Sequence, residues 1–172
     1  MHVSGSPEAR TAGRLRVDVA VGPIARMFAA EDWREPNNAG GGAVFAGRVG
    51  EVVENVAAEP DPADPPAGLF NLDAHIHDID AGHPVPYLDV TVDVVRLDGT
   101  GDDGDRPVFT GLPLVPVARP HKGTAGLHYG NNVALEARGS YRVRVQVAAS
   151  ALTGTDEPAS LDFVLDFDAA GE

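Results

Sequence analysis

One segment of the sequence, Asn71 to His77, alternates polar or ionisable residues with apolar ones. Residues two apart in a β-strand point to the same face, so Asn71, Asp73, His75 and His77 are expected to share one face of a strand. Two imidazoles and a carboxylate on one face are donors that Zn²⁺ or Cu²⁺ accepts. Asp73, His75 and His77 are therefore candidate metal ligands. A polar strand that faces solvent and binds no metal has the same pattern, and the spacing alone leaves both interpretations open.

A second cluster, His128–Asn132, follows a long segment without regular periodicity. His128 is a fourth candidate ligand, since binding groups concentrate where loops end. Gly130 and Asn131 also favour a turn, because both residues tolerate positive φ. His83 and His121 are possible additional ligands. We find no nucleophile–base pair, phosphate loop or dinucleotide fingerprint, so we expect no enzyme.

Strand-like alternation recurs along the chain, and Gly or Pro interrupts it every few residues. It predicts an all-β sandwich of about seven to nine antiparallel strands. Residues 1–13 are expected to be a disordered lead, and residues 14–172 a single domain. The predicted strands lie at 14–21, 42–53, 69–78, 87–97, 141–147 and 161–167.

Four segments between these strands are expected to be irregular or uncertain. Residues 24–35 fit a short helix or an irregular segment, and residues 57–66, rich in Pro and Asp, fit a loop. Residues 98–105 fit a hairpin loop. Residues 107–117 lead into a long irregular loop at 118–129.

The charge of the chain is strongly acidic, with 26 acidic and 13 basic residues and a net charge of −13. Lys122 is the single lysine among the basic residues. Such a surface stays hydrated in concentrated salt, where charges are screened, and predicts a salt-adapted source. The alternative is an ordinary acidic protein. The charge argues against nucleic acid and anionic membranes as partners.

The sequence has no cysteine, so disulfides and thiolate metal sites are excluded. No apolar run reaches the roughly 18 residues that a spanning helix needs, so we expect no direct membrane insertion. Met1 to Arg16 is polar and lacks the apolar core of a signal peptide. The sequence as written therefore predicts no export signal.

Several motifs resemble those of the periplasmic iron-transport-associated proteins, which accompany ferrous and ferric iron uptake. The resemblance is carried by five segments and covers about half of the chain: Asn71–His77, Val85–Val90, Leu112–Val115, His128–Val133 and Gly139–Val143. It implies an immunoglobulin-like β-sandwich, often dimeric, that binds copper or zinc rather than iron. It also implies a location outside the cytoplasm and a membrane iron permease as a partner. The acidic composition suggests a diverged, haloarchaeal-type member.

The resemblance also assigns roles at individual positions, and this chain departs from several of them. Asn71 stands where the family has a leading histidine ligand, and Asp73 stands where it has glutamate. Leu114 replaces a methionine ligand and cannot coordinate. His128 matches a ligand, and His77 matches a motif position of less defined role.

Two functions follow from this mixture of matches and departures. The first is a non-enzymatic accessory protein of metal uptake that binds a transition metal through strand and loop histidines. The second is a structural or interaction sandwich that has lost the metal and has no cofactor. The distances between the histidine nitrogens distinguish these two functions. One metal ion requires its ligand nitrogens to approach a common point, with Zn–N bonds of about 2.0–2.1 Å.

Overall fold

The computed structural model describes residues 2–3, 8–23, 27–28, 43–45, 69–97, 105–118, 126–135, 139–151 and 157–168. In these parts the chain forms β-strands and no α-helix. The strands are β1 (His2–Val3), β2 (Arg10–Ala12), β3 (Leu15–Pro23), β4 (Met27–Phe28), β5 (Ala43–Phe45), β6 (Leu69–Asp78), β7 (Val90–Leu97), β8 (Arg106–Ala118), β9 (His128–Ala134), β10 (Gly139–Val147) and β11 (Ala159–Asp168). Within the same ranges, no helix has the length and apolar character needed to cross a membrane.

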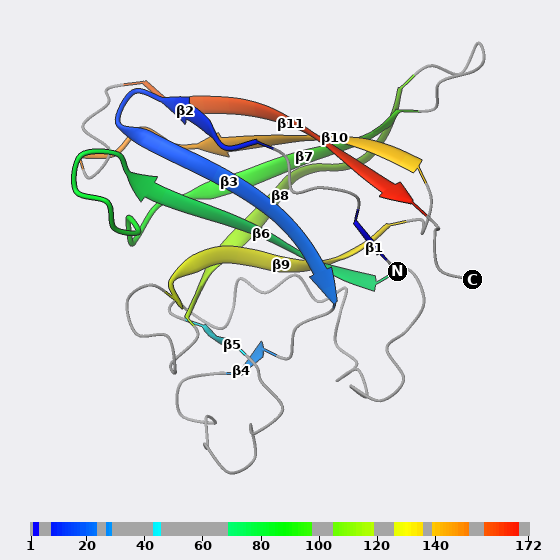
Figure 1. Ribbon diagram of the computed structural model, residues 1–172, viewed down its shortest axis with the longest axis horizontal. Coiled ribbons are helices and arrows are strands. Elements are labelled where there is room, and N and C mark those ends of the chain that lie inside the picture. Colours follow the sequence, from blue (N-terminus) through cyan, green and yellow to red (C-terminus); the bar gives the residue numbers. More distant parts are fainter. Residues whose placement is uncertain are drawn as a thin grey trace.

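The strands form two layers that share β8 (Figure 1). Sheet A contains β1, β11, β10, β7 and the first part of β8. Sheet B contains the second part of β8, then β9, β6, β3 and β2, and β5 also pairs with β8. All of these pairs are antiparallel, whereas β4 and β5 pair in parallel. β6 therefore lies inside sheet B, between β3 and β9.

Alternating apolar residues from the two sheets fill the space between them. In sheet A, Val94 of β7 lies opposite Val143 of β10, and both side chains are fully buried. In sheet B, Leu72 of β6 and Val19 of β3 are buried in the same core. Each fully buried side chain of this size stabilises the fold by about 1.5–3 kcal/mol. Because side chains alternate along a strand, this packing turns the odd-numbered residues of β6 away from the core.

β8 belongs to both sheets, since it pairs with β7 up to Leu114 and with β9 from Val115, and it contains an irregularity at Gly111. This glycine has a φ of 63°, a left-handed conformation that costs other residues about 1–2 kcal/mol. Its backbone N–H donates to Oδ1 of Asp93 at 2.8 Å, where the pairing of β7 and β8 changes register. Beyond Leu114, Val115 to Val117 pair with β9, which carries His128.

The structure confirms the predicted all-β sandwich. The segment predicted as a strand at 69–78 is β6, those at 141–147 and 161–167 lie within β10 and β11, and the one at 14–21 agrees with β3 except at residue 14. Antiparallel pairing of β7 with β8 agrees with a hairpin around residues 98–105, of which only Asp105 is described. Residues 57–66, expected to form a loop, lie outside the described residues.

Other segments differ from the sequence-based expectations. His128–Asn132 was expected to be a turn, but it is part of β9, because pairing with β6 and β8 on both sides outweighs the turn preference of Gly130 and Asn131. β7 begins at Val90 rather than residue 87, since Tyr87 has a φ of 60°. β4 lies within residues 24–35, and β1 and β2 lie within the lead at 1–13.

Candidate functional site

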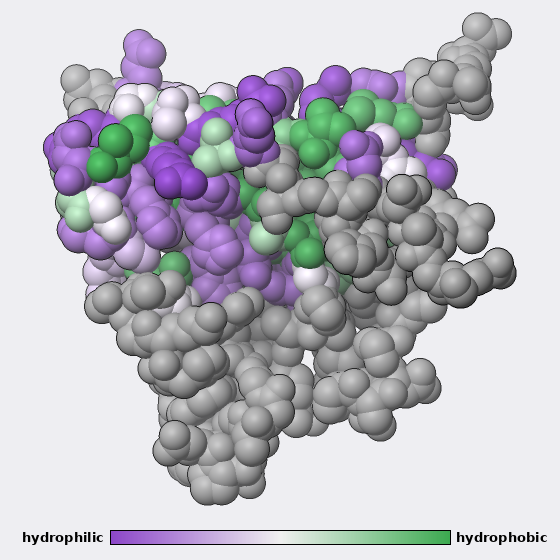
Figure 2. All heavy atoms as spheres, in the orientation of Figure 1, coloured by the Kyte–Doolittle hydropathy of each residue, from purple (hydrophilic) through white to green (hydrophobic). Residues whose placement is uncertain are grey.

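The candidate site lies on the outer face of sheet B, where β3, β6 and β9 run side by side. Asp73 of β6 is opposite Ala20 of β3 and Gly130 of β9. Asn71 is opposite Gly22 and Asn132 in the same two strands. The described surface over β3 and β6 is largely hydrophilic (Figure 2). The predicted polar face of β6 is therefore real, and it continues onto β9.

The polar residues at the centre of this face are nevertheless buried. Asn71, Asp73 and His128 expose 3%, 7% and 3% of their surface. On the β8 side, Val115 lies opposite Gly130 and Val117 lies opposite His128, and both valines are buried. A buried carboxylate is costly unless hydrogen bonds or an opposite charge compensate it. The partners of Asp73 therefore decide what this site can do.

The imidazole of His128 is one partner of Asp73. Its Nε2 lies 3.5 Å from Oδ1 of Asp73, and its Nδ1 lies 2.8 Å from the carbonyl oxygen of Gly126. A carbonyl oxygen only accepts, so Nδ1 carries the proton that it donates. In the neutral ring the lone pair is then on Nε2, the nitrogen that faces Asp73. A carbonyl that fixes the tautomer in this way is typical of metal-binding histidines, and it suits an imidazolium paired with Asp73 equally well.

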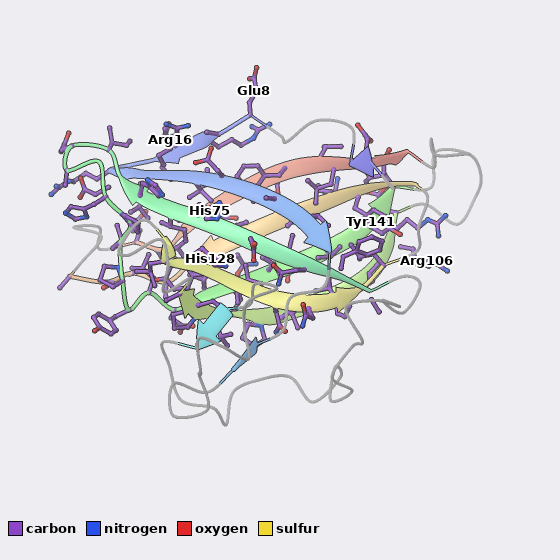
Figure 3. All side chains as sticks on the ribbon, turned by 60° about the horizontal axis from the view of Figure 1, so that its bottom comes forward. Glu8, Arg16, His75, Arg106, His128 and Tyr141 are labelled. Atoms are coloured by element: carbon purple, nitrogen blue, oxygen red, sulfur yellow. The ribbon has the colours of Figure 1, made fainter. Side chains whose placement is uncertain are left out.

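His75 lies beside His128 at a more exposed position on β6. Because Ala74 pairs with Tyr129, the next residues of the two strands, His75 and His128, are neighbours on the outer face. Their ring centroids are 5.3 Å apart and the ring planes are inclined by 57° (Figure 3). On its other side, His75 is opposite Asp18 of β3. The structure thus brings three of the predicted site residues, Asp73, His75 and His128, together.

The side-chain amide of Asn71 is the second partner of Asp73. With its nitrogen turned toward the carboxylate, Asn71 donates to Oδ1 at 2.6 Å and to Oδ2 at 2.9 Å. This orientation is required when Asp73 is ionised, because its oxygens then only accept. In the opposite orientation of the amide, the same nitrogen would instead face Oδ1 of Asn132 at 3.4 Å and the carbonyl oxygen of Asn131 at 3.5 Å. Asn71 therefore belongs to the site as a hydrogen-bond donor.

Gly130 gives the Asp73 carboxylate its space. A Cβ atom at this position would lie 2.5 Å from Oδ1 of Asp73 and 3.5 Å from the carbonyl oxygen of Leu72. The backbone of β9 therefore passes directly beside the carboxylate. The sequence suggested a turn glycine here, whereas the structure shows that the position requires a small residue.

Tyr129 and Asn131, on the opposite face of β9, hold the surroundings of the site in place. The hydroxyl of Tyr129 donates to the carbonyl oxygen of Val85 at 2.7 Å and accepts from the N–H of Leu88 at 3.0 Å. Burial raises the pKa of this hydroxyl, although the bond from Leu88 opposes the shift. The Asn131 amide donates to the carbonyl oxygen of Pro113 in β8 at 3.0 Å. The period of two through His128–Asn132 is the sequence signal for this division of roles.

The remaining histidine candidates lie apart from the Asp73–His128 pair. His77 is four residues beyond Asp73 on β6, about 13 Å along the strand, and is opposite Arg16. His83 is exposed in the turn after β6, where its Nδ1 is 3.3 Å from the carbonyl oxygen of Pro84. His121 lies outside the described residues. Leu114, at the position of the family's methionine, packs into the core.

The donor set is incomplete as a metal centre. Over the described ranges, no group of three or more His, Asp or Glu side chains is placed to hold a metal ion. Asp73 and His128 supply one oxygen and one nitrogen donor, whereas a structural zinc site uses four protein ligands and a catalytic one uses three. The described residues therefore fit a metal ion only in part.

Comparison with known proteins identifies the class to which this sandwich belongs. A family model described as Fe2+ transport protein matches residues 73–158, half of the 172-residue chain. The matched region includes Asp73, His75 and the whole of β9. The chain therefore belongs to the Fe2+ transport protein family, which confirms the iron-transport resemblance of the sequence. No curated protein matches the sequence.

Solved structures of two proteins share the fold over nearly the whole chain. FetP of uropathogenic Escherichia coli strain F11 is 16% identical, with a TM-score of 0.54, covering 94% of this chain and 93% of FetP. Copper-reconstituted P19 of Campylobacter jejuni is 14% identical, with a TM-score of 0.55, covering 97% of this chain and 98% of P19. A copper-bound variant of FetP is 15% identical, with a TM-score of 0.53, covering 96% of this chain and 94% of the variant. At these identities the likeness shows a common fold.

Proposed function

We propose that this protein is a non-enzymatic accessory protein of metal uptake that binds a transition-metal ion on the outer face of sheet B. Asp73 and His128 would hold the ion, and His75 would stand at the exposed side. Water is expected to occupy the remaining coordination positions, as in open metal sites. Copper and zinc suit these donors, and the copper-bound FetP and P19 structures support copper.

The observation that carries this proposal is the buried contact between Nε2 of His128 and Oδ1 of Asp73 at 3.5 Å. Imidazole nitrogen and carboxylate oxygen converge there, and the carbonyl of Gly126 fixes the orientation of the ring. The contact lies in the segment that matches the Fe2+ transport protein family.

We propose the wider setting from the family alone. The protein would work outside the cytoplasm, as a monomer or a homodimer, and would deliver its ion to a membrane iron permease. Fractionation of the source cells tests the location, and sedimentation at several protein concentrations tests the oligomeric state. A cytoplasmic protein would contradict the delivery role.

A second candidate function is a sandwich module without a metal. It is favoured by the two hydrogen bonds from Asn71 to Asp73 and by the absence of a three-residue donor group among the described residues. In this case the polar cluster stabilises the contact of β6 with β9, and the protein acts through its surface.

Calorimetric titration of the purified protein with Cu²⁺ and with Zn²⁺ distinguishes the two candidates. Metal uptake predicts one ion per chain at micromolar concentration and a loss of about tenfold or more in affinity in His128→Ala, since a whole ligand is removed. His83→Ala, which changes an exposed histidine outside the site, is the matched control and should bind like the parent.

The buried position of His128 requires a check of the fold. His128→Gln keeps a polar side chain of similar length, and circular dichroism compares both variants with the parent. If the parent binds neither ion, or if folded His128→Gln binds as the parent does, the metal proposal is wrong and the module without a metal is favoured.

A further inference from the structure

The carboxylate of Asp73 has a hydrogen-bond donor in the side-chain amide of Asn71. In the orientation that turns the Asn71 amide nitrogen toward Asp73, this nitrogen lies 2.6 Å and 2.9 Å from the two carboxylate oxygens, and the two residues expose only 3% and 7% of their surface. An amide nitrogen has two N–H donors, so it can serve both oxygens. The strand residues directly opposite Asp73 are Ala20 and Gly130, neither of which is ionisable. Asn71 and His128 therefore compensate this carboxylate from within the chain.

We infer that the side-chain amide of Asn71 takes the position of a cation at the Asp73 carboxylate, so that a metal ion binds there only by displacing the amide. Asn71 is thus the residue that sets the metal affinity of the site. The part of this inference that concerns metal affinity rests on the proposed function, whereas the contact itself does not.

The geometry of the site places the metal ion and the Asn71 amide in competition for the same carboxylate oxygen of Asp73. Gly130 leaves no space beside Oδ1 for a shift of the carboxylate toward β9, because even a Cβ atom there would come within 2.5 Å. An ion that approaches Oδ1 from the side of His128 must share an oxygen to which Asn71 already donates. Hydrogen bonds to a charged group are among the strong ones, so their loss subtracts from the binding free energy of the ion.

The first experiment measures the contact without any metal. Unfolding by urea in the presence of a chelator is compared for the parent, Asn71→Ala, Asp73→Asn and the double variant. We expect the effects of the two substitutions on the unfolding equilibrium constant to be non-additive by about tenfold, as for groups joined by charge-assisted hydrogen bonds. Additivity within about twofold would overturn the inference, whatever the protein binds.

The second experiment titrates Asn71→Ala with Zn²⁺ and with Cu²⁺. We expect the affinity to rise by about tenfold or more, the change that corresponds to one lost hydrogen bond to a charged group. Gln146→Ala is the matched control, because Gln146 also donates its amide to a carboxylate, that of Asp93 at 2.7 Å, but in sheet A. Its metal affinity should equal that of the parent.

The outcomes separate this inference from the proposed function. Equal or weaker binding by folded Asn71→Ala overturns the inference and leaves the proposed function standing. Binding by Asn71→Ala but not by the parent supports the inference and contradicts metal binding by the natural chain. If neither binds an ion, the proposed function is wrong and the competitive role of Asn71 is wrong with it.

Discussion

At the scale of single residues, alternate residues of the segment His128–Asn132 have different roles on the two faces of one strand. His128 and Gly130 serve the outer face, where they orient an imidazole and leave space for Asp73. Tyr129 and Asn131 serve the inner side, where they bond to Val85, Leu88 and Pro113. Each position therefore has its own physical requirement, and substitutions should have distinct effects.

Gly130→Ala should destabilise the protein by about 1–3 kcal/mol, because the added methyl group overlaps the Asp73 carboxylate and β6 must move. Urea unfolding measures the effect. Gly22→Ala is the control, since Gly22 lies opposite Asn71 in β3 and a Cβ there meets nothing within 4 Å. That change should be neutral or stabilise by a few tenths of a kcal/mol. Equal costs for the two variants would contradict the close approach at Gly130.

Tyr129→Phe should cost about 1–3 kcal/mol, because it leaves the carbonyl of Val85 and the N–H of Leu88 without the hydroxyl that bridges them. Tyr87→Phe removes the same group from a side chain that is 79% exposed and should change stability by less than about 0.5 kcal/mol. Thermal unfolding of both variants makes the comparison. A neutral Tyr129→Phe would mean that the bridge contributes nothing to the segment before β7.

At the scale of elements, the turn after β6 is fixed by one carboxylate. Oδ1 of Asp78 accepts from the backbone N–H groups of Asp80 and Ala81 at 2.9 Å each, and Oδ2 accepts from Arg14 at 2.9 Å. The N–H of Ala81, followed by the charge of Arg14, holds the pKa of this carboxyl below its usual range. The turn thus ties the end of β6 to Arg14, just before β3.

The lowered pKa of Asp78 gives the fold a specific acid sensitivity. The carboxyl binds protons more weakly in the folded than in the unfolded chain, whose Asp pKa is about 3.9. Its contribution to stability is therefore present above that value and is lost as the pH falls through the folded pKa. Asp78→Asn should flatten the decline of unfolding free energy below about pH 4.

The matched control for this acid sensitivity is Asp80→Asn, which changes a carboxylate that also contacts Arg14, at 3.3 Å, but is mostly exposed. The unfolding free energy of Asp80→Asn should decline with falling pH as steeply as that of the parent. If the unfolding free energies of Asp78→Asn and the parent decline identically at acidic pH, the turn does not depend on the Asp78 carboxylate.

Elements with clean alternation could be predicted from the sequence, and those shaped by tertiary pairing could not. β6 was predicted at both ends, because apolar and polar residues alternate through its whole length. β9 was taken for a turn, since Gly130 and Asn131 favour turns until strands on both sides pair with them. The irregularity of β8 at Gly111 coincides with a hydrogen bond from its N–H to Oδ1 of Asp93, 18 residues earlier.

The same distinction applies to the candidate site. The face that carries Asp73 and His75 follows from a period of two within one strand. The approach of His128 needs the register of β6 against β9, which pairs residues 55 to 65 positions apart. The donor role of Asn71 depends on a side-chain orientation that no spacing encodes. The sequence therefore indicated the candidate donor residues but not how they assemble.

At the scale of the whole molecule, the net charge of −13 is the dominant feature. Some carboxylates are paired on the surface, as in Arg144–Asp162 at 2.8 Å and Arg142–Asp105 at 2.6 Å. Acidic residues outnumber basic ones by 26 to 13, so repulsion between unpaired carboxylates opposes the compact state. Exposed pairs of this kind contribute only about 0–1 kcal/mol each, so they do not offset the excess.

Salt should therefore stabilise the protein. Raising NaCl from about 0.1 M to 1 M shortens the Debye length from about 10 Å to 3 Å and screens this repulsion more than it weakens the short ion pairs. We expect the midpoint of thermal unfolding to rise over this range, and KCl at equal ionic strength should give the same curve. A midpoint that is flat or falls with salt would contradict the proposed salt adaptation.

A crystal structure of the protein grown with Zn²⁺ tests whether Asp73 and His128 hold a transition-metal ion. An anomalous difference map at the zinc edge locates the ion independently of any assumed ligands. We expect a peak about 2.0–2.2 Å from Nε2 of His128 and from an oxygen of Asp73, with the Asn71 amide turned away. A map without a peak between these two residues would contradict the proposed metal site, whether or not zinc is found elsewhere in the crystal.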